Sequence, residues 1–281
     1  MITIDVCMET VFPDVPYLDR PARIAAAGFK VIEAWFPDQH LSDADLPKLR
    51  RACESAGVML NNIVANSPDG TIGGSLTNPA DQLKYLARVR ESLKCCQELG
   101  ASMMITCTGN VQPALAHADQ RRSIVDGLKA AGDLAARAGV TLVLEPLNSL
   151  IDHPGYFLDQ PEAAAAIVRE VGHPHVALLF DVYHMQIMRG CVIEMIRANI
   201  GIIRHFHSAG VPGRHELDDG ELYYPKILDA IASTGYQGCF GLEYFPAEDS
   251  AASLARMRRL LPDRRNDSAK KGTQESRYNV E

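Results

Sequence analysis

Short apolar segments typical of β-strands alternate with amphipathic segments typical of helices along most of the chain. The strand-like segments are Ile2–Cys7, Val31–Trp35, Met59–Val64, Met103–Cys107, Val140–Glu145, Val176–Asp181, Ile202–His207 and Gly238–Glu243. A glycine stands where each of several intervening helices should end, at Gly28, Gly57, Gly100, Gly139, Gly172 and Gly235. Eight such strand and helix units predict an α/β protein built as a single closed (β/α)8 barrel, the TIM barrel.

The length of the chain also fits one barrel. The sequence has 281 residues, and about 250 residues is typical of this fold. We expect the barrel over residues 1–261 and a disordered C-terminal tail over residues 262–281, where the sequence is polar and aperiodic. A doubly wound open sheet would alternate in the same way, but the first strand is not followed by a glycine-rich phosphate loop. The GTIGGS segment at 70–75 lacks the order of a nucleotide-binding motif and is interpreted as a surface loop.

Charge and cysteine usage restrict the partners and the compartment. The net charge of −7 argues against a nucleic-acid-binding surface, which needs clustered Lys and Arg. The seven cysteines form no C-x-x-C pair, and an odd number suits a reducing compartment. We find neither a signal-peptide pattern nor an apolar stretch of about 18 residues. We therefore expect a cytoplasmic protein that acts on a small molecule, without a nucleic-acid or membrane partner, and leave a homo-oligomer open.

Four residues that can bind metal ions end consecutive strand-like segments: Glu145, Asp181, His207 and Glu243. Parallel strands wound with helices between them place all their carboxyl ends on one face, so these side chains should converge. Three converging carboxylates would repel one another, because burying an unpaired charge costs on the order of several kcal/mol. The pattern therefore predicts a divalent metal site. For each residue alone, the alternative is a helix N-cap or one half of an ion pair.

Two further residues are candidates for substrate binding. Arg214 lies in the glycine- and proline-rich loop SAGVPGRHELDDGELYYP after the seventh strand, and its guanidinium suits a carboxylate. An ion pair from Arg214 to Glu216, Asp218 or Asp219 is the alternative. His184 stands three residues beyond Asp181, and either a structural or a functional role is open to it. Trp35 and Phe36 could wall the pocket and Asn110 and Asn148 could offer polar contacts, but packing in the core or at the rim is the preferred interpretation for all four.

A mononuclear site of this kind has a definite chemistry. Four protein ligands leave about two positions open on a six-coordinate ion, enough for the adjacent carbonyl and hydroxyl oxygens of one substrate. A carboxylate such as Glu145 or Glu243 could then remove the α-proton and leave an enediolate. Return of a proton to the neighbouring carbon would isomerise the substrate. Return to the opposite face of the same carbon would epimerise it.

Several segments resemble hydroxypyruvate isomerase, within the xylose-isomerase-like family of TIM barrels. They are LEPLNS with HPGYFL, LLFDVYHMQIMRG, HFHSAGVPGRHELDDGELYYP and GLEYFP. The resemblance implies an isomerase that interconverts hydroxypyruvate and tartronate semialdehyde with one divalent ion, Mn²⁺ or Mg²⁺, with Co²⁺ or Zn²⁺ as alternatives. It also implies that the glutamates matching Glu145 and Glu243 both bind the metal and transfer the proton.

The chain departs from that family at His207, where hydroxypyruvate isomerases typically have Gln. Histidine at this position resembles the ketose 3-epimerases, which use a Glu-Asp-His-Glu ligand set and a histidine matching His184. Imidazole binds manganese, cobalt or zinc well, so the departure keeps the metal site but opens the choice of substrate. The alternative function is therefore a ketose 3-epimerase acting on unphosphorylated sugars. A metal-dependent hydrolase or endonuclease and a non-catalytic sugar-binding barrel are two further classes.

Overall fold

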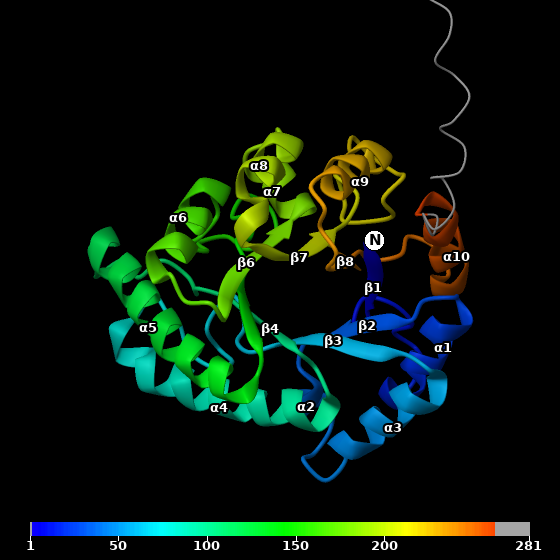
Figure 1. The fold of residues 1–281 in the computed structure, drawn as a ribbon, viewed down its shortest axis with the longest axis horizontal. Coiled ribbons are helices and arrows are strands. Elements are labelled where there is room, and N and C mark those ends of the chain that lie inside the picture. Colours follow the sequence, from blue (N-terminus) through cyan, green and yellow to red (C-terminus); the bar gives the residue numbers. More distant parts are fainter. Residues whose placement is uncertain (1, 262–281) are drawn as a thin grey trace, which may run out of the picture.

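The fold is described from a computed structural model, for residues 2–261; the tail expected at 262–281 lies outside the described residues. Eight parallel strands follow one another around a closed barrel, and β8 pairs with β1 (Figure 1). The strands are β1 (Thr3–Cys7), β2 (Val31–Ala34), β3 (Met59–Val64), β4 (Met103–Thr106), β5 (Thr141–Leu144), β6 (Val176–Asp181), β7 (Ile203–Ser208) and β8 (Cys239–Leu242). The predicted (β/α)8 barrel is therefore confirmed, and each strand bound lies within one residue of the expected position.

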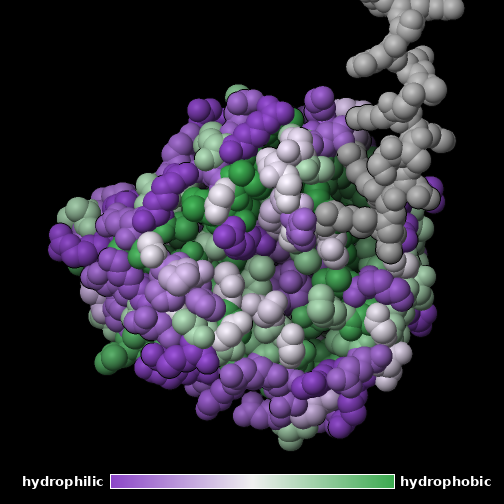
Figure 2. All heavy atoms as spheres, viewed as in Figure 1, coloured by the Kyte–Doolittle hydropathy of each residue, from purple (hydrophilic) through white to green (hydrophobic). Residues whose placement is uncertain are grey.

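Helices surround the barrel on its outside (Figure 1). The α-helices are α1 (Arg20–Ala26), α2 (Pro37–His40), α3 (Leu46–Ala56), α4 (Gln82–Leu99), α5 (His117–Ala138), α6 (Pro161–Val171), α7 (Val182–Met188), α8 (Val192–Asn199), α9 (Tyr224–Ser233) and α10 (Ser250–Leu260). Short 3-10 helices are η1 (Tyr17–Asp19), η2 (Pro79–Asp81) and η3 (Ile200–Ile202). Figure 2 shows hydrophilic side chains over these outer helices.

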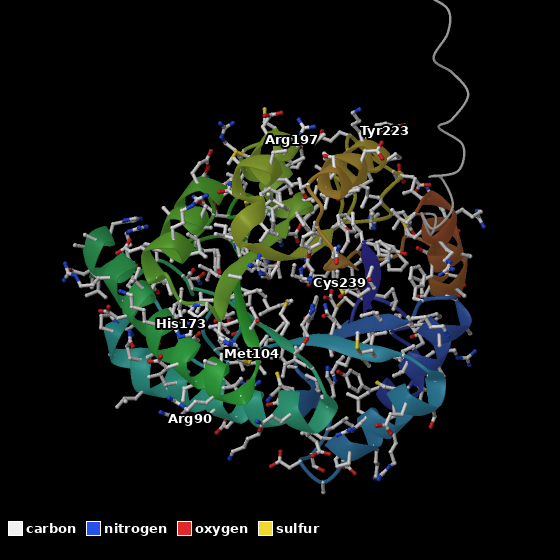
Figure 3. The ribbon with its side chains drawn as sticks, viewed as in Figure 1. Arg90, Met104, His173, Arg197, Tyr223 and Cys239 are labelled. Atoms are coloured by element: carbon white, nitrogen blue, oxygen red, sulfur yellow. The ribbon has the colours of Figure 1, made fainter. Side chains whose placement is uncertain are left out.

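The strands bury both of their faces, but the two faces differ in chemistry. Outward-facing residues such as Ile63, Leu142 and Phe180 belong to the large apolar cluster packed against the helices. Alternate residues point into the barrel. A smaller apolar cluster there joins β3 to β6, at Val64, Ile105, Val143, Ala177 and Leu179. Figure 3 shows Met104 and Cys239 on strands near the middle of the molecule, and Arg90, Arg197 and Tyr223 at its periphery.

Buried polar side chains fill the part of the interior formed by β1, β2, β3 and β7. They include Asp5, Glu33, Asn62 and His205, all fully buried. The Asn61 amide donates to Asp5 Oδ2 at 2.8 Å, and burial raises the pKa of the Asp5 carboxyl to about 7. A buried polar group without a partner is costly, so hydrogen bonds within this layer are needed to stabilise it. The apolar pattern of the strands did not reveal the layer.

The seven cysteines all lie within the described residues and are unpaired, as their spacing predicted. Among residues 2–261, none of the helices combines the length and the apolar character needed to cross a bilayer. The cytoplasmic location expected from the sequence stays a prediction.

Helices α3, α4, α5 and α6 each end at a glycine in the left-handed region, as expected from the sequence. At Gly139 the φ angle is 70°, and a Cβ would meet nothing within 4 Å. Gly139→Ala should therefore lower the free energy of unfolding by about 1 kcal/mol, through backbone strain alone. Gly201→Ala is the matched control, because a Cβ there also meets open space but φ is not positive. Urea unfolding measures both variants, and equal effects would contradict this account.

Candidate active site

The structure brings together all four of the predicted residues at the carboxyl ends of β5 to β8. Glu145 directly follows β5, Asp181 is the last residue of β6, His207 lies in β7 and Glu243 directly follows β8. All four are buried, and one nitrogen or oxygen atom of each lies within 4.8 Å of the others. Asp181 pairs with His207 across β6 and β7, and His207 pairs with Gly241 across β7 and β8, so strand register fixes their heights in the barrel.

His207 stands among the carboxylates. Its Nδ1 is 3.1 Å from Glu145 Oε1 and 3.5 Å from Glu243 Oε2. Its other ring nitrogen, Nε2, is 3.2 Å from Glu33 Oε2 on β2. The imidazole therefore has one nitrogen directed at the cluster and one directed at a carboxylate outside it.

Asp181 combines two of the roles considered for it. Its Oδ1 accepts the backbone N–H of Tyr183 at 2.6 Å and of His184 at 3.2 Å, so it caps the N-terminus of α7. Its Oδ2 makes no such bond and lies 3.5 Å from His184 Nε2. The N-cap alternative thus holds for one oxygen, and the other remains available to the cluster.

Burial and mutual repulsion shift the pKa values of the cluster. Burial raises the pKa of Asp181 to about 7, and the nearby Glu243 carboxylate adds to that shift. Burial also raises the pKa of Glu145, although His207 opposes the shift. Burial alone would lower the pKa of His207, but Glu33, Glu243 and Glu145 outweigh it and raise that pKa well above its usual value. Without a cation, the cluster is therefore stabilised by holding protons.

A small cavity of about 210 Å³ opens beside the cluster. It reaches Glu243, and its other walls are Trp35, Phe36, Val64, Pro68, Cys107, Leu147, His153, His184 and Arg214. Trp35 Nε1 donates to Glu243 Oε1 at 2.8 Å, which orients that carboxylate. Trp35 and Phe36 line the cavity, the less favoured of the two interpretations considered for them from the sequence. Asn110 is not among the lining residues and instead forms a β-bridge with Tyr156.

Arg214 lines this cavity and pairs with Glu243. The ion pair to Glu216, Asp218 or Asp219 considered from the sequence is wrong. Glu216 accepts the hydroxyl of Ser253 at 2.7 Å, and Asp218 pairs with Arg256. The loop turns Arg214 away from its acidic neighbours because its backbone is left-handed there, with φ of 59°. Its Nε is buried and makes no hydrogen bond to any residue in the described part of the chain.

His184 is fully buried with a defined tautomer. The Asn148 backbone N–H (3.2 Å) and its side-chain amide (2.7 Å) both donate to His184 Nδ1, so the proton sits on Nε2. Burial and nearby positive groups lower the pKa of His184 well below its usual value, which keeps the ring neutral. Within residues 2–261, Nε2 makes no hydrogen bond. Asn148 therefore holds the ring of His184 and is not among the residues that line the cavity.

Glu33 is the residue near the cluster that the sequence did not single out. It lies inside β2, in the segment VIEAW, and is fully buried. His205 and His207 lower the pKa of its carboxyl, although burial alone would raise it. A charged residue within an apolar strand was the available signal.

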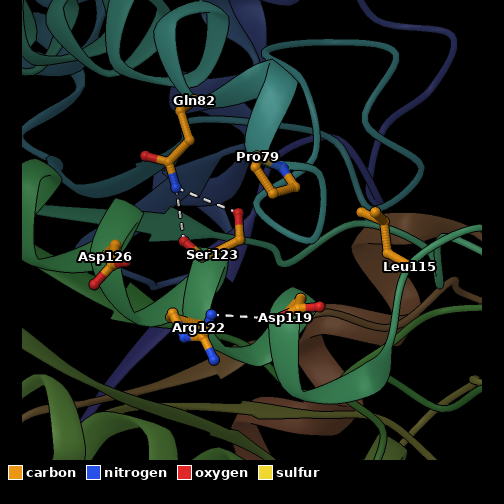
Figure 4. Close-up of a pocket in the computed structure, with 7 residues that line it drawn as sticks. All are labelled: Pro79, Gln82, Leu115, Asp119, Arg122, Ser123 and Asp126. Atoms are coloured by element: carbon orange, nitrogen blue, oxygen red, sulfur yellow. Dashed lines mark hydrogen bonds and ion pairs between the residues drawn. The ribbon is translucent and has the colours of Figure 1, made fainter.

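A second hollow of about 570 Å³ lies between the N-terminal parts of α4 and α5 (Figure 4). Four of its lining residues are bonded in two pairs: Arg122 pairs with Asp119 at 3.2 Å, and the Gln82 amide donates to the Ser123 carbonyl at 2.8 Å. None of the four cluster residues lines it. The candidate metal ligands therefore lie apart from this hollow, at the barrel mouth.

Residues 21–260 match the family model of the xylose isomerase-like TIM barrel. The chain belongs to this family. Over 256 residues it is 31% identical to the 2-oxo-tetronate isomerase of Cupriavidus necator, covering 90% of this chain and 96% of that protein. Over 271 residues it is 33% identical to a Xenopus laevis protein provisionally named hydroxypyruvate isomerase, covering 92% and 96% of the two chains. These matches support an isomerase, as the resemblance implied.

Several solved structures share the same fold. A crystal structure titled AP endonuclease, family 2, from Brucella melitensis has a TM-score of 0.85 at 28% identity, and the match covers 92% of this chain and 99% of that one. Sugar epimerases are also among the structural matches, at identities of 18% to 22%, and these speak to the fold alone.

The protons held by the cluster should oppose cation binding. Asp181 is protonated below about pH 7 and His207 holds a proton at neutral pH, whereas only their deprotonated forms bind a cation. Mn²⁺ binding at about pH 7 should therefore release protons, and the Kd should fall as the pH rises through about 7. Calorimetry in two buffers of different ionisation enthalpy counts the released protons. The prediction is contradicted if the heat of Mn²⁺ binding does not depend on the buffer and the Kd is the same at about pH 6 and about pH 8.

Proposed function

We propose that this protein is a metal-dependent isomerase that interconverts hydroxypyruvate and tartronate semialdehyde, or a closely related 2-oxo acid. The observation that carries the proposal is the cluster of Glu145, Asp181, His207 and Glu243, with an atom of each within 4.8 Å of the others, beside a small cavity that contains an arginine. The names of the two sequence relatives support the same substrate class.

The donor set of the cluster fits a divalent cation. Three carboxylates and one imidazole nitrogen supply hard oxygen ligands and a nitrogen ligand, a combination suited to Mn²⁺ or Mg²⁺ and compatible with Co²⁺ or Zn²⁺. We propose that Glu145, Asp181, Glu243 and the Nδ1 of His207 hold the ion. When bound, such an ion polarises a substrate carbonyl and stabilises negative charge on its oxygen.

Glu145 and Glu243 are the proposed proton carriers. They follow β5 and β8, on either side of the imidazole of His207, and so approach a bound substrate from two directions. One glutamate takes a proton from the hydroxymethyl carbon of hydroxypyruvate, which leaves an enediolate. Delivery of a proton to the former carbonyl carbon, with transfer of the hydroxyl proton between the two oxygens, gives tartronate semialdehyde.

Arg214 and His184 are the proposed substrate-binding residues. Arg214 Nε and His184 Nε2 are both buried donors, and neither has a hydrogen-bond partner among the described residues. A buried donor without a partner is costly, so an incoming substrate oxygen would satisfy each of them. The guanidinium is held 5.4 Å from the ring centroid of Tyr183 and 5.8 Å from that of Phe245. If Arg214 binds the carboxylate of a substrate, the rest of that substrate would extend toward the cluster, because Arg214 also contacts Glu243.

The size and the lining of the cavity favour a short keto acid over a ketose. A volume of about 210 Å³ is below the range of about 300 to 1,000 Å³ typical of sites for larger ligands. Trp35, Phe36, Val64 and Leu147 present apolar surface, which would leave several hydroxyls of a hexose without partners. The observation that favours the alternative, a ketose 3-epimerase, is the histidine at position 207.

The decisive experiment offers hydroxypyruvate, 2-oxo-tetronate and a panel of unphosphorylated ketoses to the Mn²⁺-loaded protein in deuterated water. We expect turnover of a short 2-oxo acid with deuterium incorporated on carbon, loss of turnover with a chelator and recovery on adding Mn²⁺. NMR and mass spectrometry follow product and label. Efficient epimerisation of a ketose, with hydroxypyruvate and 2-oxo-tetronate untouched, would overturn the proposal in favour of the alternative.

Glu145→Gln and Glu243→Gln should each reduce kcat by at least about 100-fold, because an amide cannot carry the proton. Glu91→Gln, the same change at an exposed site on α4, is the matched control and should keep wild-type turnover. Metal content and circular dichroism must accompany the rates, so that loss of the ion or of the fold is recognised. A variant with bound Mn²⁺ that turns over near the wild-type rate would exclude that glutamate as a proton carrier.

A further inference from the structure

Glu33 is the meeting point of a hydrogen-bond network behind the proposed metal ligands. A single oxygen, Glu33 Oε2, lies 2.8 Å from the Asn62 amide nitrogen, 3.0 Å from His205 Nε2 and 3.2 Å from His207 Nε2. The three partners come from β3 and β7, so they hold this carboxylate from two sides of the barrel interior.

We infer that Glu33 is a positioning residue that fixes the tautomer and the ring orientation of His207. By accepting the Nε2–H of His207, it leaves Nδ1 as the nitrogen whose lone pair would face a cation once the ring is neutral. Nδ1 is the atom directed at Glu145 (3.1 Å) and Glu243 (3.5 Å). A histidine that binds a metal through one nitrogen commonly donates the other N–H to a carboxylate, which orients the ring and strengthens the ligand. The inference rests on the metal site proposed above.

The neighbouring backbone is shaped to accommodate this pair. Gly241, on β8, lies opposite His207 in the strand register. A Cβ at this position would come within 2.8 Å of the His207 ring and 3.1 Å of Glu33 Oε1. The absence of a side chain at Gly241 therefore leaves room for the imidazole and the carboxylate to lie side by side.

A second cation bound by Glu33, His205 and His207 is the competing interpretation, since these three also lie close enough to share an ion. The Asn62 amide argues against it, because its N–H donates to the same Glu33 oxygen at 2.8 Å. A cation on that oxygen would stand beside the positive end of an N–H dipole. The distances of 3.0 and 3.2 Å to the two imidazoles are hydrogen-bond distances, and the network is complete without an ion at Oε2.

The test measures Mn²⁺ binding, as free Mn²⁺ by electron paramagnetic resonance, in the full chain and in Glu33→Gln. We expect one ion per chain in the wild type and a Kd about 10 to 100 times weaker in Glu33→Gln. The visible absorption of the Co²⁺-loaded variant should also shift, because the imidazole ligand is no longer held. Asp5→Asn is the matched control: it makes the same carboxyl-to-amide change in the same buried layer, where Asp5 Oδ2 contacts Asn61. Asp5 lies 3.9 Å from His205 but makes no hydrogen bond to His207, so Asp5→Asn should weaken Mn²⁺ binding much less than Glu33→Gln does.

A His207→Gln background separates positioning from a general structural effect. Without the imidazole, Glu33→Gln should weaken Mn²⁺ binding by less than about twofold further, because its target is gone. An effect that persists in this background, a wild-type Kd in Glu33→Gln, or equal weakening by Asp5→Asn would overturn the inference. Two ions in the wild type and one in Glu33→Gln would make Glu33 a ligand instead. A wild-type chain that binds no Mn²⁺ would refute the proposed metal site itself.

Discussion

The closed parallel barrel brings like charges together, and the rest of the site depends on that constraint. Residues that follow neighbouring strands must share the small space at the barrel mouth, so Glu145, Asp181 and Glu243 surround one imidazole. Burial raises the pKa of Glu145 and of Asp181, and the carboxylates raise the pKa of His207. Protons compensate this charge in the cation-free protein. A divalent ion can take their place because it satisfies the same carboxylates with greater charge.

The proposed recognition of the substrate depends on the positive charge of Arg214. Arg214 offsets the negative cluster through Glu243 and still exposes a free donor to the cavity. Its left-handed backbone is secured by its N–H, which donates to Gly210 at 3.0 Å, and by its carbonyl, which accepts from Phe245 at 2.8 Å. Strained backbone at a residue held this firmly is typical of functional positions. One cationic donor among largely apolar walls is the observation behind the proposal of a small anionic substrate rather than a polyol.

The fold and the convergence of the four candidate metal ligands could be predicted from the sequence because both follow from periodic patterns. Strand ends recur at intervals close to one strand and helix unit, and parallel topology then places Glu145 and Asp181 together. The contacts of Arg214 could not be predicted, because they depend on the path of a loop whose acidic neighbours turn elsewhere. Glu33 was missed for a related reason. A charged residue within the apolar strand β2 is visible in the sequence, but the contact of Glu33 across the barrel to His207 is not.

The central claim is that the ends of β5 to β8 form one mononuclear metal site. Anomalous diffraction from a crystal of the Mn²⁺-loaded protein tests it most directly. We expect one strong anomalous peak. It should lie within about 2.5 Å of a carboxylate oxygen from each of Glu145, Asp181 and Glu243, and of His207 Nδ1. A peak elsewhere in the barrel, or a fully loaded crystal in which one of these four groups points away from the ion, would contradict it.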